Sequence, residues 1–544
     1  MRHCLSYIII YSTLFIIVGC KPEAKVPGQF AEAGARADIY PDYMGVVVPP
    51  NIAPLNFIVR DSFATTYVAQ LQGGGEELLA AAGEDGKVQM DSVAWRKLLV
   101  ASKGSDVTVN IYADRPDGWV HFQPFTVSVA EEPIDAFLSY RLIEPGYELY
   151  RQLGIYQRNL TTFDEVPVYE NNREYNDGEN HCVNCHNFRM GSTDRMLFHV
   201  RSNHGGTIVV QDGKAQKIQF KDSTIITSAV YPSWHPTENL VAFSTNKTGQ
   251  AFHLYYPEKI EVMDEASDLL LYDAEKNEVS HIIRTSVEME TFPCWAPDGR
   301  TLYYCAADPG PYLDPSLPDS MLNRQILAAY DSLRYNLMSI SFDPSTRSFG
   351  KPQLVVDAQF EKKSISVPRV SPDGRYILYT KGDYGQFHIW HTSSDLWVKD
   401  LQTDSCYALG AANSPDVDSF HSWSSNGRWF VFSSRRMDGN YTRPFIAYFD
   451  AQGRAHKPFV LPQEDPEWNI LLLKSYNVPE LTRDAVRISE KDLRHCIYDT
   501  DGELATYKQN PTAIVRLDGM TGASPKKPVD GTSGASAPIQ TSPR

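Results

Sequence analysis

The chain has 544 residues, and its 67 Asp and Glu side chains outnumber its 51 Lys and Arg side chains, so the formal net charge is −16. This length is enough for large buried cores and predicts two to four domains. The negative charge argues against nucleic acid or an anionic lipid surface as a partner, because both would repel the protein. No apolar run after the N-terminus is long enough to cross a bilayer, so any attachment to a membrane is expected through lipid only.

Residues 1–20 predict a lipoprotein signal peptide. Arg2 and His3 precede an apolar run that ends at Gly19 and is too short for a membrane span. The pair Gly19-Cys20 resembles the lipobox of bacterial lipoproteins, which implies that Cys20 is lipidated and becomes the first residue of the mature chain. An ordinary secretory signal that contains a cysteine is the alternative. We therefore expect a protein of the bacterial cell envelope, anchored by its N-terminal lipid on the periplasmic side or at the cell surface.

Three segments are expected before the first repeat. Residues 21–49 are polar and rich in Ala, Gly and Pro, which predicts a tether. Residues 50–132 alternate apolar and polar positions between turn residues, which predicts a small β-sandwich of immunoglobulin-like or fibronectin-like kind. Residues 133–194 form a bridge that is dense in tyrosine. Its rings are expected to pack on the next domain or to form part of a cofactor pocket.

Within this bridge, Cys182-Val183-Asn184-Cys185-His186 matches the attachment motif of a c-type haem. Two thiols three positions apart can each bond to a vinyl group of one porphyrin, and the histidine that follows can ligate the iron. A zinc site would need a second pair of ligands, and the remaining cysteines form none. A disulfide or redox pair leaves His186 unexplained and stays open as an alternative. We expect one covalent haem c, bound through Cys182 and Cys185, with its iron held by His186.

The other side of the iron needs a second ligand or stays open. Met196 and His199 lie on one strand-like stretch and point to opposite faces of it. We expect His199 as the distal ligand, with Met196 second and His204 and His235 behind them; a distal ligand elsewhere, or none, is the alternative. Two axial ligands suit electron transfer, whereas an open position suits a small ligand and its chemistry.

A repeat follows the haem motif. Each copy predicts a strand, a tight turn and a second strand, because Pro sets the first φ of the turn and Gly accepts the positive φ that closes it. Four clear copies begin at Tyr231-Pro232-Ser233-Trp234, Phe292-Pro293-Cys294-Trp295, Val367-Pro368-Arg369-Val370 and Phe420-His421-Ser422-Trp423. The first copy departs from the pattern and is expected to place His235 at the rim of a loop.

These copies resemble the WD40-like, or PD40, repeats of TolB-type β-propellers. The resemblance implies a mainly β protein with a six-bladed TolB-like propeller over residues 195–517, whose two degenerate blades lie near 196–218 and near 478–517. The order of lipobox, small β domain, haem motif and propeller resembles that of PD40 lipoproteins with a CxxCH motif found in Bacteroidetes. Residues 518–544 contain almost no large apolar side chain, which predicts a disordered tail.

Two local features concern the second and third copies. Cys294 and Cys305 flank one predicted hairpin, where they could form a disulfide, although two buried thiols are the preferred interpretation. The long interval after them predicts a helix from Asp319 to Asn336, which would cover a propeller face as packing or as a lid over a ligand site.

The resulting hypothesis is a monohaem lipoprotein that exchanges electrons with a redox or envelope protein. The partner would dock on the propeller or at the haem edge, and the acidic surface favours a basic partner. Two alternatives are an interaction scaffold with a structural haem and a haem enzyme that acts on a small substrate. No catalytic residues are assigned, because no Ser/His/Asp set or carboxylate pair follows from spacing.

Overall fold

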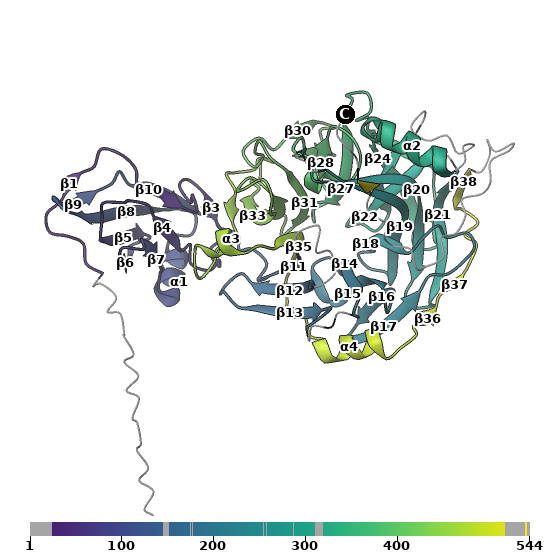
Figure 1. Cartoon of the computed structure of the whole chain (residues 1–544), viewed down its shortest axis with the longest axis horizontal. Coiled ribbons are helices and arrows are strands. Elements are labelled where there is room, and N and C mark those ends of the chain that lie inside the picture. The colour runs from purple at the N-terminus through teal and green to yellow at the C-terminus, as the bar shows by residue number, and fades with distance from the viewer. Residues whose placement is uncertain are drawn as a thin grey trace, which may run out of the picture.

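The computed structural model describes residues 24–144, 152–173, 176, 178–253, 255–256, 258–286, 288–309, 319–516 and 539–540. It is mainly β-structure: an N-terminal domain stands beside a ring of sheets (Figure 1). Within these residues no helix is both long and apolar enough to cross a membrane. The predicted signal peptide with Cys20 lies outside the described residues, and so does the predicted tail apart from β39 (Ile539–Gln540).

The N-terminal domain contains two sheets and one helix. The larger sheet has seven strands: β1 (Ala31–Glu32), β3 (Val47–Val48), β5 (Thr66–Gly73), β6 (Glu76–Ala82), β8 (Asp106–Arg115), β9 (Gly118–His121) and β10 (Phe125–Val129). The smaller sheet has three strands: β2 (Ile39–Tyr40), β4 (Phe57–Val59) and β7 (Lys87–Val88). Helix α1 (Ser92–Ala101) is capped by the Asp91 side chain and buries Trp95 against this core.

Residues 24–49 belong to this domain, which differs from the predicted tether. β1, β2 and β3 each pair with a strand of the domain. Five side chains of the segment are buried in its core: Ala37, Ile39, Tyr43, Val46 and Val48. Each strand is only two residues long, so no alternating pattern could reveal it in the sequence.

Six sheets follow one another around a central axis (Figure 1). Their innermost strands are β14 (His181–Arg189), β18 (Ala229–Trp234), β22 (Met289–Trp295), β27 (Ser364–Val370), β31 (Asp418–Trp423) and β35 (Ser475–Thr482). Each inner strand contacts the next, and β35 contacts β14, so the ring is closed. Below, each sheet is named by its inner strand.

The outer strands complete each sheet. The β14 sheet adds β15 (Ser192–Ser202), β16 (Gly206–Gln211) and β17 (Lys214–Gln219), and the β18 sheet adds β19 (Leu240–Phe252), β20 (Ile260–Asp273) and β21 (Glu278–Thr285). The β22 sheet adds β23 (Thr301–Ala307), β24 (Asn336–Asp343), β25 (Ser348–Phe349) and β26 (Gln353–Val356). The β27 sheet adds β28 (Tyr376–Gly382), β29 (Asp395–Asp400) and β30 (Cys406–Ala408), and the β31 sheet adds β32 (Trp429–Ser434), β33 (Arg443–Tyr448) and β34 (Phe459–Val460). Three short strands, β36 (Glu503–Leu504), β37 (Thr506–Tyr507) and β38 (Ile514–Arg516), pair with outer edges, and α4 (Glu490–Tyr498) packs beside β17 and β13.

The tyrosine-rich segment closes the ring. It supplies β11 (Phe137–Ile143), β12 (Gly154–Asn159) and β13 (Glu165–Glu170), and β11 pairs with β35 from the far end of the chain. Tyr140 packs edge-on against Tyr476, with ring centroids 4.8 Å apart. The described residues from 137 to 194 are therefore part of the ring and not a bridge before it. The degenerate blade predicted near 478–517 is therefore built differently. Its inner strand is β35, and the other three strands of that sheet are β11, β12 and β13.

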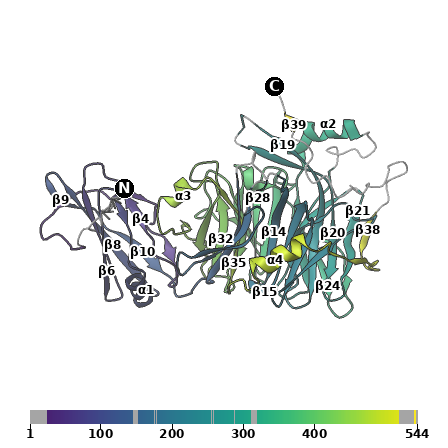
Figure 2. The same cartoon turned by 60° about the horizontal axis from the view of Figure 1, so that its bottom comes forward.

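Insertions gather at one end of the axis. Helix α2 (Asp319–Ala329) and the far end of β19 project on the same side of the ring (Figure 2). The helix predicted from Asp319 to Asn336 begins as expected but stops at Ala329; a short 3₁₀ turn, η3 (Tyr330–Ser332), follows it, and Asn336 already belongs to β24. Cys294 and Cys305 are free and buried, which confirms the preferred interpretation of that pair.

Candidate functional site

Strand β14 carries all five residues of the predicted haem motif. In its pairing with β15, Cys182 lies opposite Arg201 and Asn184 lies opposite His199. The register then shifts at a bulge, where Cys185 takes a positive φ of 53°. Both thiols of the motif are free, so the disulfide alternative is not realised here.

The same bulge recurs in all six inner strands. One residue in each has a φ between 46° and 53°: Cys185, Tyr231, Phe292, Val367, Phe420 and Val478. A register shift accompanies each of them. The next residue is proline in four strands and histidine in two: Pro232, Pro293, Pro368, Pro479, His186 and His421. Cys185-His186 is therefore the copy, in the β14 sheet, of the repeat that opens the other sheets.

Five of the bulge residues pack together at the centre of the ring. Phe292, Val367 and Phe420 belong to one apolar cluster, against which Tyr231 and Val478 pack. The rings of Tyr231 and Phe292 stand 4.1 Å apart. Burial raises the pKa of Tyr231, and the nearby Cys185 thiol adds to the rise. Cys185 thus faces the centre of the ring beside Tyr231.

His186 points sideways, into the β35 sheet. Its side chain is 3% exposed, and the backbone of Val478 and of Ser139 lies beside the imidazole. Neither ring nitrogen has a hydrogen bond of ordinary geometry. Burial lowers the pKa of His186 to about 3, and the Arg141 charge lowers it further.

His421, on β31, packs in the same way against the β27 sheet. Its Nε2 lies 2.9 Å from the Leu378 carbonyl of the preceding sheet, and the backbone of Val367 flanks its ring. Burial lowers the pKa of His421 to about 3 as well. Val367 and Val478 are the bulge residues of their sheets, so the two histidines occupy matching places and both fill an interface between neighbouring sheets.

This arrangement does not fit an axial haem ligand. A porphyrin needs a flat space against the ligating nitrogen of His186, and its edge must also reach the two thiols. Strands β11 and β35 occupy the space beside His186, whereas Cys185 faces the axis. In the closed ring, Cys182 and His186 lie on the β35 side and Cys185 lies beside Tyr231. A porphyrin at the buried His186 would therefore have to displace β11 and β35.

His199 is not brought together with His186. Its Nδ1 lies 2.9 Å from the Thr207 hydroxyl, and its ring packs on Phe243 of the β18 sheet at 5.6 Å. Met196 instead joins Phe188 in the apolar cluster on the β35 side, so Met196 and His199 point to opposite faces as predicted. Because His186 and His199 lie on opposite faces of one sheet, they cannot ligate one iron.

The two remaining histidine candidates have other partners. His204 lies 3.7 Å from Glu179, away from the axis. His235 is fully buried: its Nε2 is 2.9 Å from the Gly299 carbonyl, and its Nδ1 accepts the amide of Glu238 at 2.9 Å. This corrects the prediction of a histidine at a loop rim, because the His235 ring caps its own turn. Gly299 has a φ of 66°, and a Cβ there would lie 2.5 Å from that ring.

A buried acidic cluster at the insertion end was missed in the sequence. Asp264 accepts the Tyr335 hydroxyl at 2.5 Å and the side-chain amides of Asn246 and Gln386 at 3.4 Å. Burial raises the pKa of Asp264 to about 6. Nearby, Glu261 accepts the Tyr384 hydroxyl at 2.6 Å. These groups come from the β19–β20 hairpin and from segments far along the chain, so no local spacing could have pointed to them.

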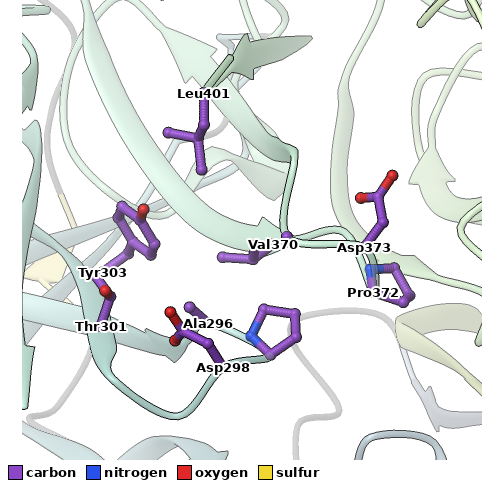
Figure 3. Close-up of a pocket in the computed structure, with 10 residues that line it drawn as sticks. Ala296, Asp298, Thr301, Tyr303, Val370, Pro372, Asp373 and Leu401 are labelled. Carbon is purple, nitrogen blue, oxygen red and sulfur yellow. The ribbon is translucent and has the colours of Figure 1, made fainter.

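A cavity of about 410 Å³ lies at the opposite end of the sheets (Figure 3). It separates the β22–β23 turn from the β27–β28 turn, and its lining includes Asp298, Tyr303, Val370 and Asp373. The two carboxylates are turn residues of the repeat. Among the described residues, no group of three or more His, Cys, Asp or Glu side chains has the arrangement of a metal site.

Replacing His186 with proline tests the structural role of the motif. Because proline holds this place in four other sheets, the His186→Pro variant is expected to lose less than about 2 kcal/mol of unfolding free energy, mainly through the lost ring volume. The matched control, Val200→Pro in β15, breaks a ladder with two neighbours and is expected to cost about 3 kcal/mol or more. Urea unfolding of both variants checks this. Equal losses would contradict the equivalence of the six bulges.

No protein-family model and no curated protein matches the chain. Among solved structures, the tricorn protease shares 12% identity over 75% of this chain and 43% of its own, with a TM-score of 0.30. Oligogalacturonate lyase in complex with manganese shares 12% over 79% and 99%, with a TM-score of 0.26. Prolyl oligopeptidase B from Galerina marginata shares 10% over 66% and 50%, with a TM-score of 0.30. The chain thus spans less than half the length of the tricorn protease. The closed ring of sheets described above is itself of β-propeller type.

Proposed function

We propose that this protein is a lipid-anchored interaction scaffold of the bacterial cell envelope, built on a six-bladed TolB-like propeller of PD40 repeats with a small β-sandwich in front of it. One observation carries the proposal: Cys185-His186 occupies the bulge that all six inner strands share. The motif then serves the closure of the ring, and the protein acts through its surfaces.

The finer architecture has support in the strand pairing. Six inner strands in cyclic contact correspond to six blades, and the pairing of β11 with β35 joins the two ends of the ring. The two sheets of the N-terminal domain enclose a common apolar core, as in a sandwich.

The second candidate is the electron carrier with one covalent haem c. It is favoured by the free thiols of Cys182 and Cys185 and by the ring nitrogens of His186, which lack well-formed hydrogen bonds. Haem bound there would supply a one-electron redox centre. It would require the contact between the β14 and β35 sheets to open, since the backbone of both β11 and β35 stands beside His186.

A thiol count separates the two candidates. The described residues contain six free cysteines: Cys182, Cys185, Cys294, Cys305, Cys406 and Cys496. In denatured protein purified from its own cells, the scaffold proposal expects all six to react with a thiol reagent. Covalent haem would block Cys182 and Cys185, so a count of four would favour the electron carrier.

The lipid anchor has its own test. Cells that express the protein are expected to incorporate labelled palmitate into the wild type and not into a Cys20→Ser variant, because Cys20 is the proposed acceptor. The variant should leave the membrane fraction. Membrane attachment that survives the substitution would contradict the anchor.

A further inference from the structure

The loop between β34 and β35 exposes four large apolar side chains within six residues. Trp468 is 46% exposed, and the other three are more exposed still: Ile470 50%, Leu471 60% and Leu473 63%. The first three lie on the short helix α3 (Trp468–Leu471). Exposed apolar side chains are ordinarily scattered, whereas a contiguous group marks a contact surface. We name residues 468–473 the apolar loop.

Arg443 holds the apolar loop from below. Its side chain is 1% exposed, and its guanidinium donates to the carbonyls of Asn469 at 2.9 Å, Leu472 at 2.6 Å and Lys474 at 2.8 Å. Burial lowers the pKa of Arg443. Since the guanidinium draws the backbone inward at three points, the side chains between those points turn towards water.

The N-terminal domain fixes the start of the same loop. The Asn56 amide donates to the Glu464 carbonyl at 2.9 Å, and Lys87 forms ion pairs with Asp465 at 3.0 Å and Glu467 at 2.7 Å. The N-terminal domain thus holds the residues just before the apolar loop, and Arg443 holds the loop itself. Helix α3 lies between the N-terminal domain and the ring (Figure 1). A surface ordered before binding loses less entropy when a partner docks, so this geometry suits recognition.

The rim of the apolar loop is acidic. Glu464 is exposed, and the carboxylates of Asp465 and Glu467 remain half-exposed beside their lysine. Lys474, the basic residue at the other end, pairs with Glu144 at 2.9 Å. Together with the net charge of −16, this rim disfavours an anionic membrane and also a second copy of the same acidic chain.

We propose that the apolar loop docks a protein partner that offers an apolar cleft bordered by Lys and Arg side chains. Large apolar side chains at the centre and charged groups at the rim are the ordinary anatomy of a protein interface, and the acidic rim selects a basic partner. The exposed side chains of the apolar loop, with Trp468 among them, would fill the cleft and supply most of the affinity. This inference rests on the proposed scaffold function and names the surface that performs it.

The test starts in living cells. A photo-crosslinking amino acid replaces Leu471 in the full-length chain, and in a control chain it replaces Phe360, which is 88% exposed on another loop. We expect one protein to crosslink at position 471 and not at position 360. An adduct with lipid, an adduct with a second copy of this chain, or no adduct would each overturn the proposal.

The crosslinked protein is then identified, purified and titrated against the whole chain. Leu471→Asp is expected to weaken binding about 30-fold, as for a buried interface anchor, and Phe360→Asp less than about twofold. Raising the salt concentration should weaken the wild-type complex, because opposite charges meet at the rim. An affinity that changes neither in Leu471→Asp nor with the salt concentration would overturn the proposal.

The same preparations separate this inference from the proposed function. The variants leave residues 182–186 unchanged, so a thiol count on them still reports haem attachment. A haem-loaded protein that binds its partner through the apolar loop would contradict the scaffold without haem and leave the docking surface intact.

Discussion

Replacing Arg443 with methionine is expected to lower the free energy of unfolding by about 4 kcal/mol. Methionine keeps much of the apolar stem but removes every donor. The carbonyls of Asn469, Leu472 and Lys474 would then lose their partner in a place where the arginine is almost fully buried. An unpaired buried polar group costs about 1–3 kcal/mol, and the saved desolvation of the guanidinium offsets only part of three such losses.

Denaturant unfolding of the whole chain measures this loss. The control is Arg454→Met, since Arg454 is largely exposed and pairs with Asp450 across a short surface loop; a loss below about 1 kcal/mol is expected there. Hydrogen exchange of residues 468–474 should also quicken in Arg443→Met. If both variants lost equal stability, Arg443 would not be the residue that holds the apolar loop.

Glu480→Gln is expected to stabilise the protein at pH 8 by about 2 kcal/mol and to change little at pH 4.5. Glu480 lies on β35, where it accepts the backbone amide of Phe188 at 2.9 Å and the Asn187 side chain at 3.3 Å, both on one carboxylate oxygen. Removal from bulk water raises the pKa of Glu480 to about 7, against an ordinary 4.5. Glutamine keeps the accepting oxygen and carries no charge.

The direction of the pH effect follows from that raised pKa. The folded protein holds the Glu480 proton more tightly than the unfolded chain does. The free energy of unfolding of the wild type is therefore highest, as far as Glu480 is concerned, below pH 4.5, and it falls as the pH rises towards 7. Glutamine removes this loss. Urea unfolding at both pH values checks it, with the exposed Glu503→Gln as a control that should stay within about 0.5 kcal/mol at either pH. A wild type whose stability rises between pH 5 and 7 relative to Glu480→Gln would contradict the assignment.

The sequence predicted the propeller type of fold because four copies of one strand–turn–strand pattern recur along the chain. Degenerate blades were predicted near 196–218 and near 478–517, but β14 and β35 were not predicted as copies of the repeat. Cys185-His186 and Val478-Pro479 take the same bulge, but neither is followed by the Asp-Gly or Asn-Gly turn that marks the second, third and fourth copies. Pairing of β11 with β35 across most of the chain could not be read from local patterns either, since it depends on which strand ends meet in space.

The haem motif shows the limit of a short pattern. Five residues define it, yet attachment also needs a free face on which two thiols and an imidazole meet one porphyrin. In β14 the bulge turns Cys185 to the axis and His186 to the β35 sheet. His421 of β31 packs in the same way against the β27 sheet. Asp264 is the opposite example: its buried hydrogen bonds exist in the structure, but its partners Tyr335 and Gln386 belong to no sequence motif that could have predicted them.

The most direct test is an absorption spectrum of the mature protein, oxidised and then reduced with dithionite, after expression together with a c-type haem maturation system. The account in which Cys182, Cys185 and His186 are a strand of the ring predicts no Soret band that survives denaturation in acid and organic solvent. A Soret band that stays with the denatured chain in wild type and vanishes in a Cys182→Ser, Cys185→Ser variant would contradict it and make this protein a c-type haem protein.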